Sequence, residues 1–167
     1  GKNYFRNNLS LISQLSGYSV GDIISSPEKN ILAFAAAYEI VYEATRNKLM
    51  RSPDIIDHGY VLAYLSELPE PVSGLQNDYA LNSYLYSVLS FLNDSALASL
   101  YKFPVQDPDM DMFFGAENLK VLRASRVTIS GGRIAGSGGT LFKGSNLPVI
   151  NSPDYGPALY DPAGSCN

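Results

Sequence analysis

Three carboxylates at alternate positions are the residues of this chain whose spacing comes nearest to a binding motif. Asp107, Asp109 and Asp111 match positions 1, 3 and 5 of a calcium loop, where side-chain oxygens converge on a hard cation. The second half of the motif is absent, because Met112 stands in place of the turn glycine and Asn118 in place of the bidentate glutamate. These aspartates are a candidate Ca²⁺ site, and the alternative is a solvated acidic loop.

The single histidine, His58, is of the side-chain type that most often acts as a general base at neutral pH. A catalytic base also needs an orienting carboxylate and a nucleophile, and Asp54 and Ser52 lie near it in the sequence. Asp54, four residues earlier, is equally the first-turn carboxylate that pairs with a histidine on the same helix. With no further group converging on this position, we expect no catalytic residues and predict that the chain is not an enzyme.

The glycine-rich stretch 131–139 is the remaining segment with a composition typical of ligand binding. It lacks the GxxxxGK[ST] spacing of a phosphate-binding loop, and the triplet Lys143-Gly144-Ser145 does not complete one. No helix pattern follows it, so the helix N-terminus that would hold a phosphate is missing as well. Turns between short strands account for these glycines, and the sequence predicts no cofactor other than the candidate Ca²⁺.

Charge is distributed unevenly along the chain, whose net charge is −4. Residues 1–116 carry seven Lys and Arg against thirteen Asp and Glu, whereas residues 117–167 carry five against three. A basic segment on an acidic body can dock on its own body, on a neighbouring copy or on nucleic acid. Nucleic acid is not expected, because Phe142 is the one ring between 118 and 153 that could stack on a base. The predicted interface residues are Lys120, Arg123, Arg126, Arg133 and Lys143.

Helical periodicity and capping signals fill residues 1–104, which we interpret as a helical domain. The clearest helix has Ser26 as its N-cap and Pro27 at its first position, and Ser52-Pro53 repeats this start signal. Residues 20–24 are predicted to form a short turn, Asn77 and Asp78 to open a later helix, and Asp94 to cap the last one. Short links between these segments predict an antiparallel bundle of about four to five helices.

The pattern changes after the helices, and the predicted fold class is therefore α+β. Residues 105–118 are expected to form an acidic linker loop, and residues 119–167 a small Gly-rich β segment followed by an extended Pro-rich arm. Alternation over 121–129, a turn at 130–132 and a return strand at 133–135 indicate a hairpin. The single cysteine, Cys166, excludes a disulfide within the chain and leaves pairing between chains open.

These features favour assembly over catalysis. The segment 119–167 has too little apolar surface to become ordered by itself, so it must rest on another surface. We predict a non-enzymatic structural or assembly subunit that docks through this segment on copies of itself or on other subunits. Extended arms are typical of virion shells and filaments, so a virion capsid or an extracellular assembly is the expected setting, with no membrane span. The alternatives are an extrinsic, extracytoplasmic binding module of a larger complex and an unrecognised carboxylate-dependent enzyme.

Overall fold

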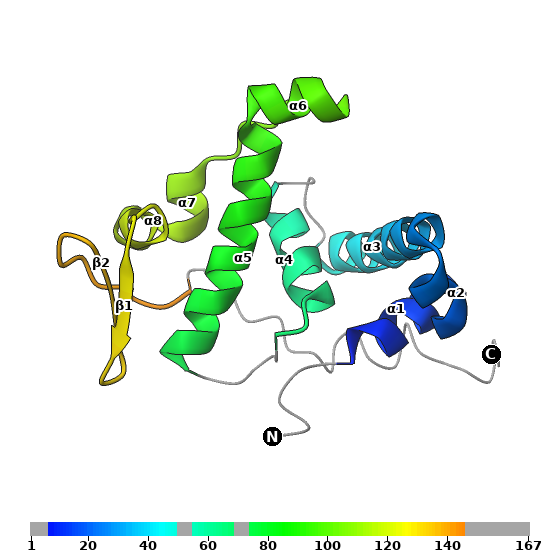
Figure 1. The fold of residues 1–167 in the computed structure, drawn as a ribbon, viewed down its shortest axis with the longest axis horizontal. Coiled ribbons are helices and arrows are strands. Elements are labelled where there is room, and N and C mark those ends of the chain that lie inside the picture. The colour runs from blue at the N-terminus through cyan, green and yellow to red at the C-terminus, as the bar shows by residue number, and fades with distance from the viewer. Residues whose placement is uncertain (1–6, 50–54, 69–73, 146–167) are drawn as a thin grey trace. The chain divides into compact units, whose positions relative to one another are not determined.

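The computed structural model describes residues 7–49, 55–68 and 74–145 (Figure 1). In these ranges the chain is mostly helical, with eight helices and a two-stranded antiparallel sheet near the C-terminal end. The described residues fall into two compact units, one up to Leu68 and the other from Gly74 to Ser145. The α+β prediction is confirmed in this coarse form.

The described residues of the first unit form helices that pack around the long helix α3. The bounds are α1 (Asn8–Ser16), α2 (Val20–Ser25), α3 (Pro27–Leu49) and α4 (Ile55–Leu65), and α3 contacts the other three. Their shared core consists of Leu15, Ala37, Val41, Val61 and Leu65. In addition, the Asn8 side-chain amide donates a hydrogen bond to the Leu65 carbonyl, which ties the start of α1 to the end of α4.

The long helix begins as the sequence predicts. Pro27 is its first residue, and the Ser26 hydroxyl accepts a hydrogen bond from the Lys29 backbone N–H at 3.3 Å. Pro at this position loses no helical hydrogen bond, because the first N–H groups of a helix have no partner within it. The second predicted start signal, Ser52-Pro53, lies outside the described residues.

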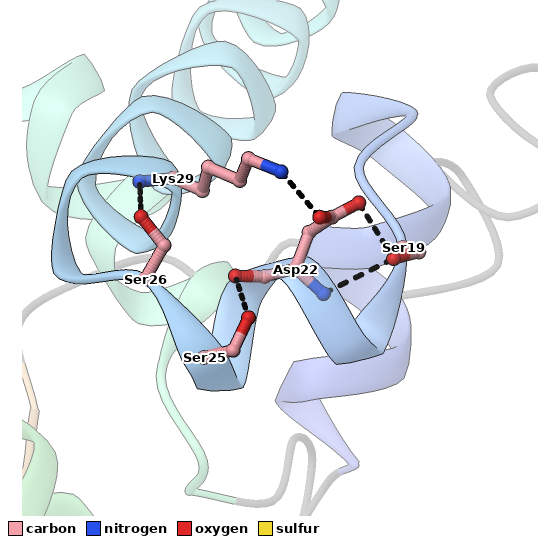
Figure 2. A network of polar contacts seen from close by, with 5 residues as sticks. All are labelled: Ser19, Asp22, Ser25, Ser26 and Lys29. Carbon is pink, nitrogen blue, oxygen red and sulfur yellow. Dashed lines mark hydrogen bonds and ion pairs between the residues drawn. The ribbon is translucent and has the colours of Figure 1, made fainter.

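Residues 20–24, predicted to be a turn, form helix α2 instead (Figure 2). The Ser19 hydroxyl accepts from the Asp22 backbone N–H at 3.1 Å and donates to the Asp22 carboxylate at 2.7 Å. Lys29 of α3 forms a hydrogen-bonded ion pair with the same carboxylate. The hydrogen bond from Lys29, followed by the one from Ser19, holds the pKa of Asp22 below its usual value. An N-cap and an ion pair to the next helix thus define α2, which is too short for a helical periodicity to be recognised in the sequence.

The second unit contains the remaining described elements. They are α5 (Leu75–Asn93), α6 (Ser95–Tyr101), α7 (Met110–Phe114), α8 (Ala116–Leu122), β1 (Val127–Ser130) and β2 (Arg133–Gly136). Strand β2 contacts both α5 and α8, so the β segment packs on helices. The prediction grouped the helices of residues 75–101 with the first helical domain, whereas contacts group α5 and α6 with the β segment.

The predicted acidic linker, residues 105–118, is not a continuous loop. It contains α7 and the first turn of α8, separated by Gly115 at φ 79°. Phe113 and Phe114 of α7 are buried, and burying two such rings stabilises a short helix that has little intrinsic stability. The strand predicted from residue 121 was also placed too early, because Val121 is the buried face of α8 and β1 begins at Val127.

The cap of α2 can be tested by removing the Ser19 hydroxyl. Ser19→Ala should lower the free energy of unfolding by about 1 kcal/mol, because the Asp22 N–H loses its partner. Ser25→Ala is the matched control in the same network, since its hydroxyl only reaches the Asp22 carbonyl at 3.4 Å. Urea unfolding of the full chain measures both, and equal losses for the two variants would contradict the capping role.

Candidate interaction surface

A tight hairpin forms the centre of the β segment. Strands β1 and β2 pair antiparallel, with Ser130 opposite Arg133 and Ile129 opposite Ile134. Gly131 and Gly132, at φ 54° and 73°, form the two-residue turn between them. Two successive left-handed residues define a type I′ turn, in which glycine carries no steric cost and the strands keep their natural twist.

The outer edge of β1 is open. The Ile134 carbonyl accepts from the Phe142 N–H and the Gly136 N–H donates to the Thr140 carbonyl, both at 2.9 Å, so these two residues turn their backbone groups away from β1. Pairs alternate along an antiparallel ladder, and their partners Ile129 and Val127 therefore turn their own N–H and C=O groups to the outside. No described residue pairs with that side of β1.

The two faces of the hairpin differ in what covers them. Val127 packs against the buried cluster of Val121, Ile134 and Phe142. Ile129 lies on the same inner face, two residues further along, yet 54% of its surface is exposed. The apolar inner face thus extends beyond the part that the second unit covers.

The hairpin is fixed to α8 by close packing and by one buried amide. A Cβ added to Gly136 would lie 3.0 Å from the Ala124 Cβ and 3.3 Å from the Val121 Cα, so the strand approaches α8 more closely than a side chain would allow. The Asn118 side chain donates to the Phe114 carbonyl at 3.0 Å and to the Gly144 carbonyl at 2.6 Å. Its oxygen accepts from the Lys143 N–H at 2.8 Å.

The five predicted interface cations all lie on the second unit with exposed side chains. Lys120 is engaged in an ion pair with Glu117 at 2.6 Å, and its hydrogen bond and charge lower the pKa of Glu117. The other four form no ion pair with any residue in the described ranges. They are Arg123, Arg126, Arg133 and Lys143, and they remain a predicted interface.

The candidate calcium residues are not brought together. Within the described part of the chain, no three His, Cys, Asp or Glu side chains are grouped in a way that could hold a metal ion. Asp109 instead caps α7 by accepting from the Met112 N–H at 2.9 Å, and Asp107 accepts from the Asn93 amide at 3.0 Å. Asp111 lies in the first turn of α7, where the helix dipole favours an anion. The alternating spacing reflects a helix start.

His58 is a packing residue of the first unit. Its ring stacks on Tyr42 with centroids 4.6 Å apart, and its Nδ1 shares a hydrogen bond of 2.5 Å with the Tyr38 hydroxyl. Burial lowers the pKa of His58, and the charges of Asp57 and Glu39 oppose that shift. Ser52 and Asp54, the partners considered for catalysis, lie outside the described residues.

Comparison with family models, with curated proteins and with solved structures finds no match for this chain. No helix in residues 7–49, 55–68 or 74–145 has both the length and the apolar character needed to cross a membrane. A functional proposal for this chain therefore has to be argued from the geometry of its own residues. Sequence reasoning had identified the basic side chains, but it missed the open β1 edge and the role of Asn118, which depends on partners distant in sequence.

The Asn118 amide can be tested by truncation. Asn118→Ala leaves the Lys143 N–H and the Gly144 carbonyl without their partner and should lower the free energy of unfolding by about 2 kcal/mol or more. Hydrogen exchange at the Lys143 amide should accelerate in the same variant. Asn82→Ala is the control, because Asn82 is equally buried but its amide donates within its own helix, to the Asp78 carbonyl. Unchanged exchange at Lys143 in Asn118→Ala would refute the role of the amide.

The His58 environment predicts a pH dependence. Because its folded pKa lies below the ordinary value of 6.5, the unfolded chain takes up a proton at higher pH than the folded chain does. The stabilisation is therefore complete above pH 6.5 and is lost as the pH falls toward the folded pKa. His58→Phe should flatten the decrease in melting temperature between neutral and mildly acidic pH. Tyr38→Phe keeps the titrating ring and should retain that decrease; identical pH profiles for wild type and His58→Phe would disprove the assignment.

Proposed function

We propose that this chain is a non-enzymatic assembly subunit that docks on neighbouring subunits through its C-terminal segment, residues 119–167. In this proposal the helices form the body of the subunit, and the hairpin with the arm that follows it makes the contact. The setting we favour is a virion shell or a filament, where such subunits repeat many times. The partner is a protein, either another copy of the chain or another subunit of the assembly.

The observation that carries this proposal is the open β1 edge. A strand edge with unpaired N–H and C=O groups accepts an additional strand, and proteins commonly protect such edges with lysine, proline or a bulge. Strand β1 reads Val-Thr-Ile-Ser and has neither charge nor proline. Ile129, at the same edge, adds an exposed apolar side chain on the continuation of the core face. Backbone pairing and burial of Ile129 would therefore act together in one contact.

Helices α5 and α8 already stabilise the hairpin, so the open edge is the part of the sheet that can still accept a strand. The sheet has two strands, and among the described residues an isolated bridge between Ala135 and Leu141 extends it on the β2 side. Addition of a strand at β1 would satisfy the outward groups of Val127 and Ile129. This surface is suited to binding a protein backbone, which supports a structural role.

The proposal predicts concentration-dependent association of the full chain, measured by sedimentation velocity from low to high micromolar concentration. Ile129→Lys should abolish the part of this association that uses the β1 edge, because a lysine there places a charge against an incoming strand. Leu100→Lys is the matched control, since Leu100 is 67% exposed on α6 of the same unit and away from the hairpin.

Circular dichroism should show wild-type helical content for both variants. A wild-type chain that remains monomeric throughout the concentration range would rule out self-assembly and leave the extrinsic binding module as the better interpretation. Association of Ile129→Lys at wild-type strength would show that the β1 edge is not the contact.

A further inference from the structure

Helix α3 presents an exposed stripe that combines apolar and acidic side chains. Ile31 is 69% exposed and Leu32 is 46% exposed, values far above those of core residues. Glu28, Ala35 and Glu39 are exposed as well, and the spacing of three to four residues places all five on one side of the helix. We call these residues the outer α3 stripe. Neither Glu28 nor Glu39 forms an ion pair with a described residue.

The hairpin carries apolar and basic side chains, in place of apolar and acidic ones, on the face that points away from its core. The register places Thr128, Arg133 and Ala135 on this face, and the bridge from Ala135 adds Leu141, which is 37% exposed. Arg126 belongs to the same face, because its carbonyl accepts from the Ser137 N–H one step beyond the last strand pair. We call these residues the outer hairpin face. Its apolar centre lies between two arginines.

The two surfaces match in spacing as well as in charge. Glu28 and Glu39 are eleven residues apart, which corresponds to about 16 Å along a helix. On the hairpin, Ser137 lies opposite Arg126 and follows Arg133 by four residues along β2 and its extension. The two arginines are therefore separated by about 14 Å along the strand direction. In both surfaces the apolar side chains lie between the charges. An aligned contact would therefore bury the apolar centres and bring each arginine to a glutamate.

Pairing of like surfaces is disfavoured by the same charges. Two α3 stripes in contact, in either direction, would bring glutamate to glutamate, and two outer hairpin faces would bring arginine to arginine. Like charges placed together across an interface cost free energy, whereas complementary ones select the partner and its alignment. The observations thus favour a contact between unlike surfaces.

We propose that the outer hairpin face of one copy docks on the outer α3 stripe of a second copy, with Arg126 and Arg133 placed at Glu28 and Glu39. This inference rests on the proposed assembly function and names the surface that receives the hairpin. The contact is heterologous, because different patches of the two copies meet. Such contacts propagate, and they produce a ring if the rotation closes or a filament if it does not. The β1 edge is left open for a separate contact.

Charge reversal tests the contact in the full-length chain. One variant carries Glu28→Arg and Glu39→Arg, and the other carries Arg126→Glu and Arg133→Glu. Each variant alone presents like charges to itself and should associate about tenfold or more weakly than wild type in sedimentation velocity at low salt. An equimolar mixture should regain wild-type association, because the hairpin of each variant then meets the α3 stripe of the other with complementary charge.

Control variants Glu67→Arg and Lys102→Glu change exposed charges outside both surfaces and should leave association unchanged. If the reversed variants associate like wild type, or if the mixture stays as weak as its components, the contact is overturned, while the β1-edge association measured with Ile129→Lys can still stand. A wild-type chain that is monomeric at all concentrations overturns both the contact and self-assembly. Circular dichroism of each variant shows whether loss of association reflects loss of the fold.

Discussion

The second unit depends on the side chain of Asn118, a buried amide on α8. Its three hydrogen bonds join the end of α7, the start of the segment after the hairpin and α8 itself, so three parts of the chain meet at one group. A buried amide of this kind is stable only when its donors and acceptors are all engaged, and this one is engaged in both senses. With residues 143–144 held in this way, Phe142 stays in the core and the extension of the sheet beside β2 is fixed.

Because of this anchoring, one face of the hairpin attaches it to the second unit, and its other face and the β1 edge remain exposed. The inner face and the Gly136 approach attach it to α8, and the same attachment fixes the direction of the β1 edge and of the outer arginines. A marginal two-stranded sheet becomes a rigid part of a larger core because helices supply the apolar surface that it lacks. Residues 119–167 were expected to need another surface in order to become ordered. For the described hairpin, helices α5 and α8 of the same unit provide that surface.

The elements that could be predicted from the sequence are those defined by local chemistry. Ser26 caps the start of α3, Asp94 caps α6 through the Ala96 and Leu97 N–H groups, and the Gly-Gly turn defines the hairpin. The helices α7 and α8 could not be predicted in the same way, because they depend on the burial of phenylalanines and on partners distant in sequence. The aspartate spacing is ambiguous for a related reason. A carboxylate that caps a helix and one that begins a calcium loop have the same local pattern, and only the tertiary structure distinguishes them.

The glycine pair at the tip of the hairpin determines how readily this element forms before it contacts another molecule. Because the turn joins residues adjacent in the chain, closing it costs little entropy, and hairpins of this type form in about 1–10 μs. In the proposed contacts the hairpin would therefore meet its partner already formed, without the ordering cost that a segment folding on contact must overcome.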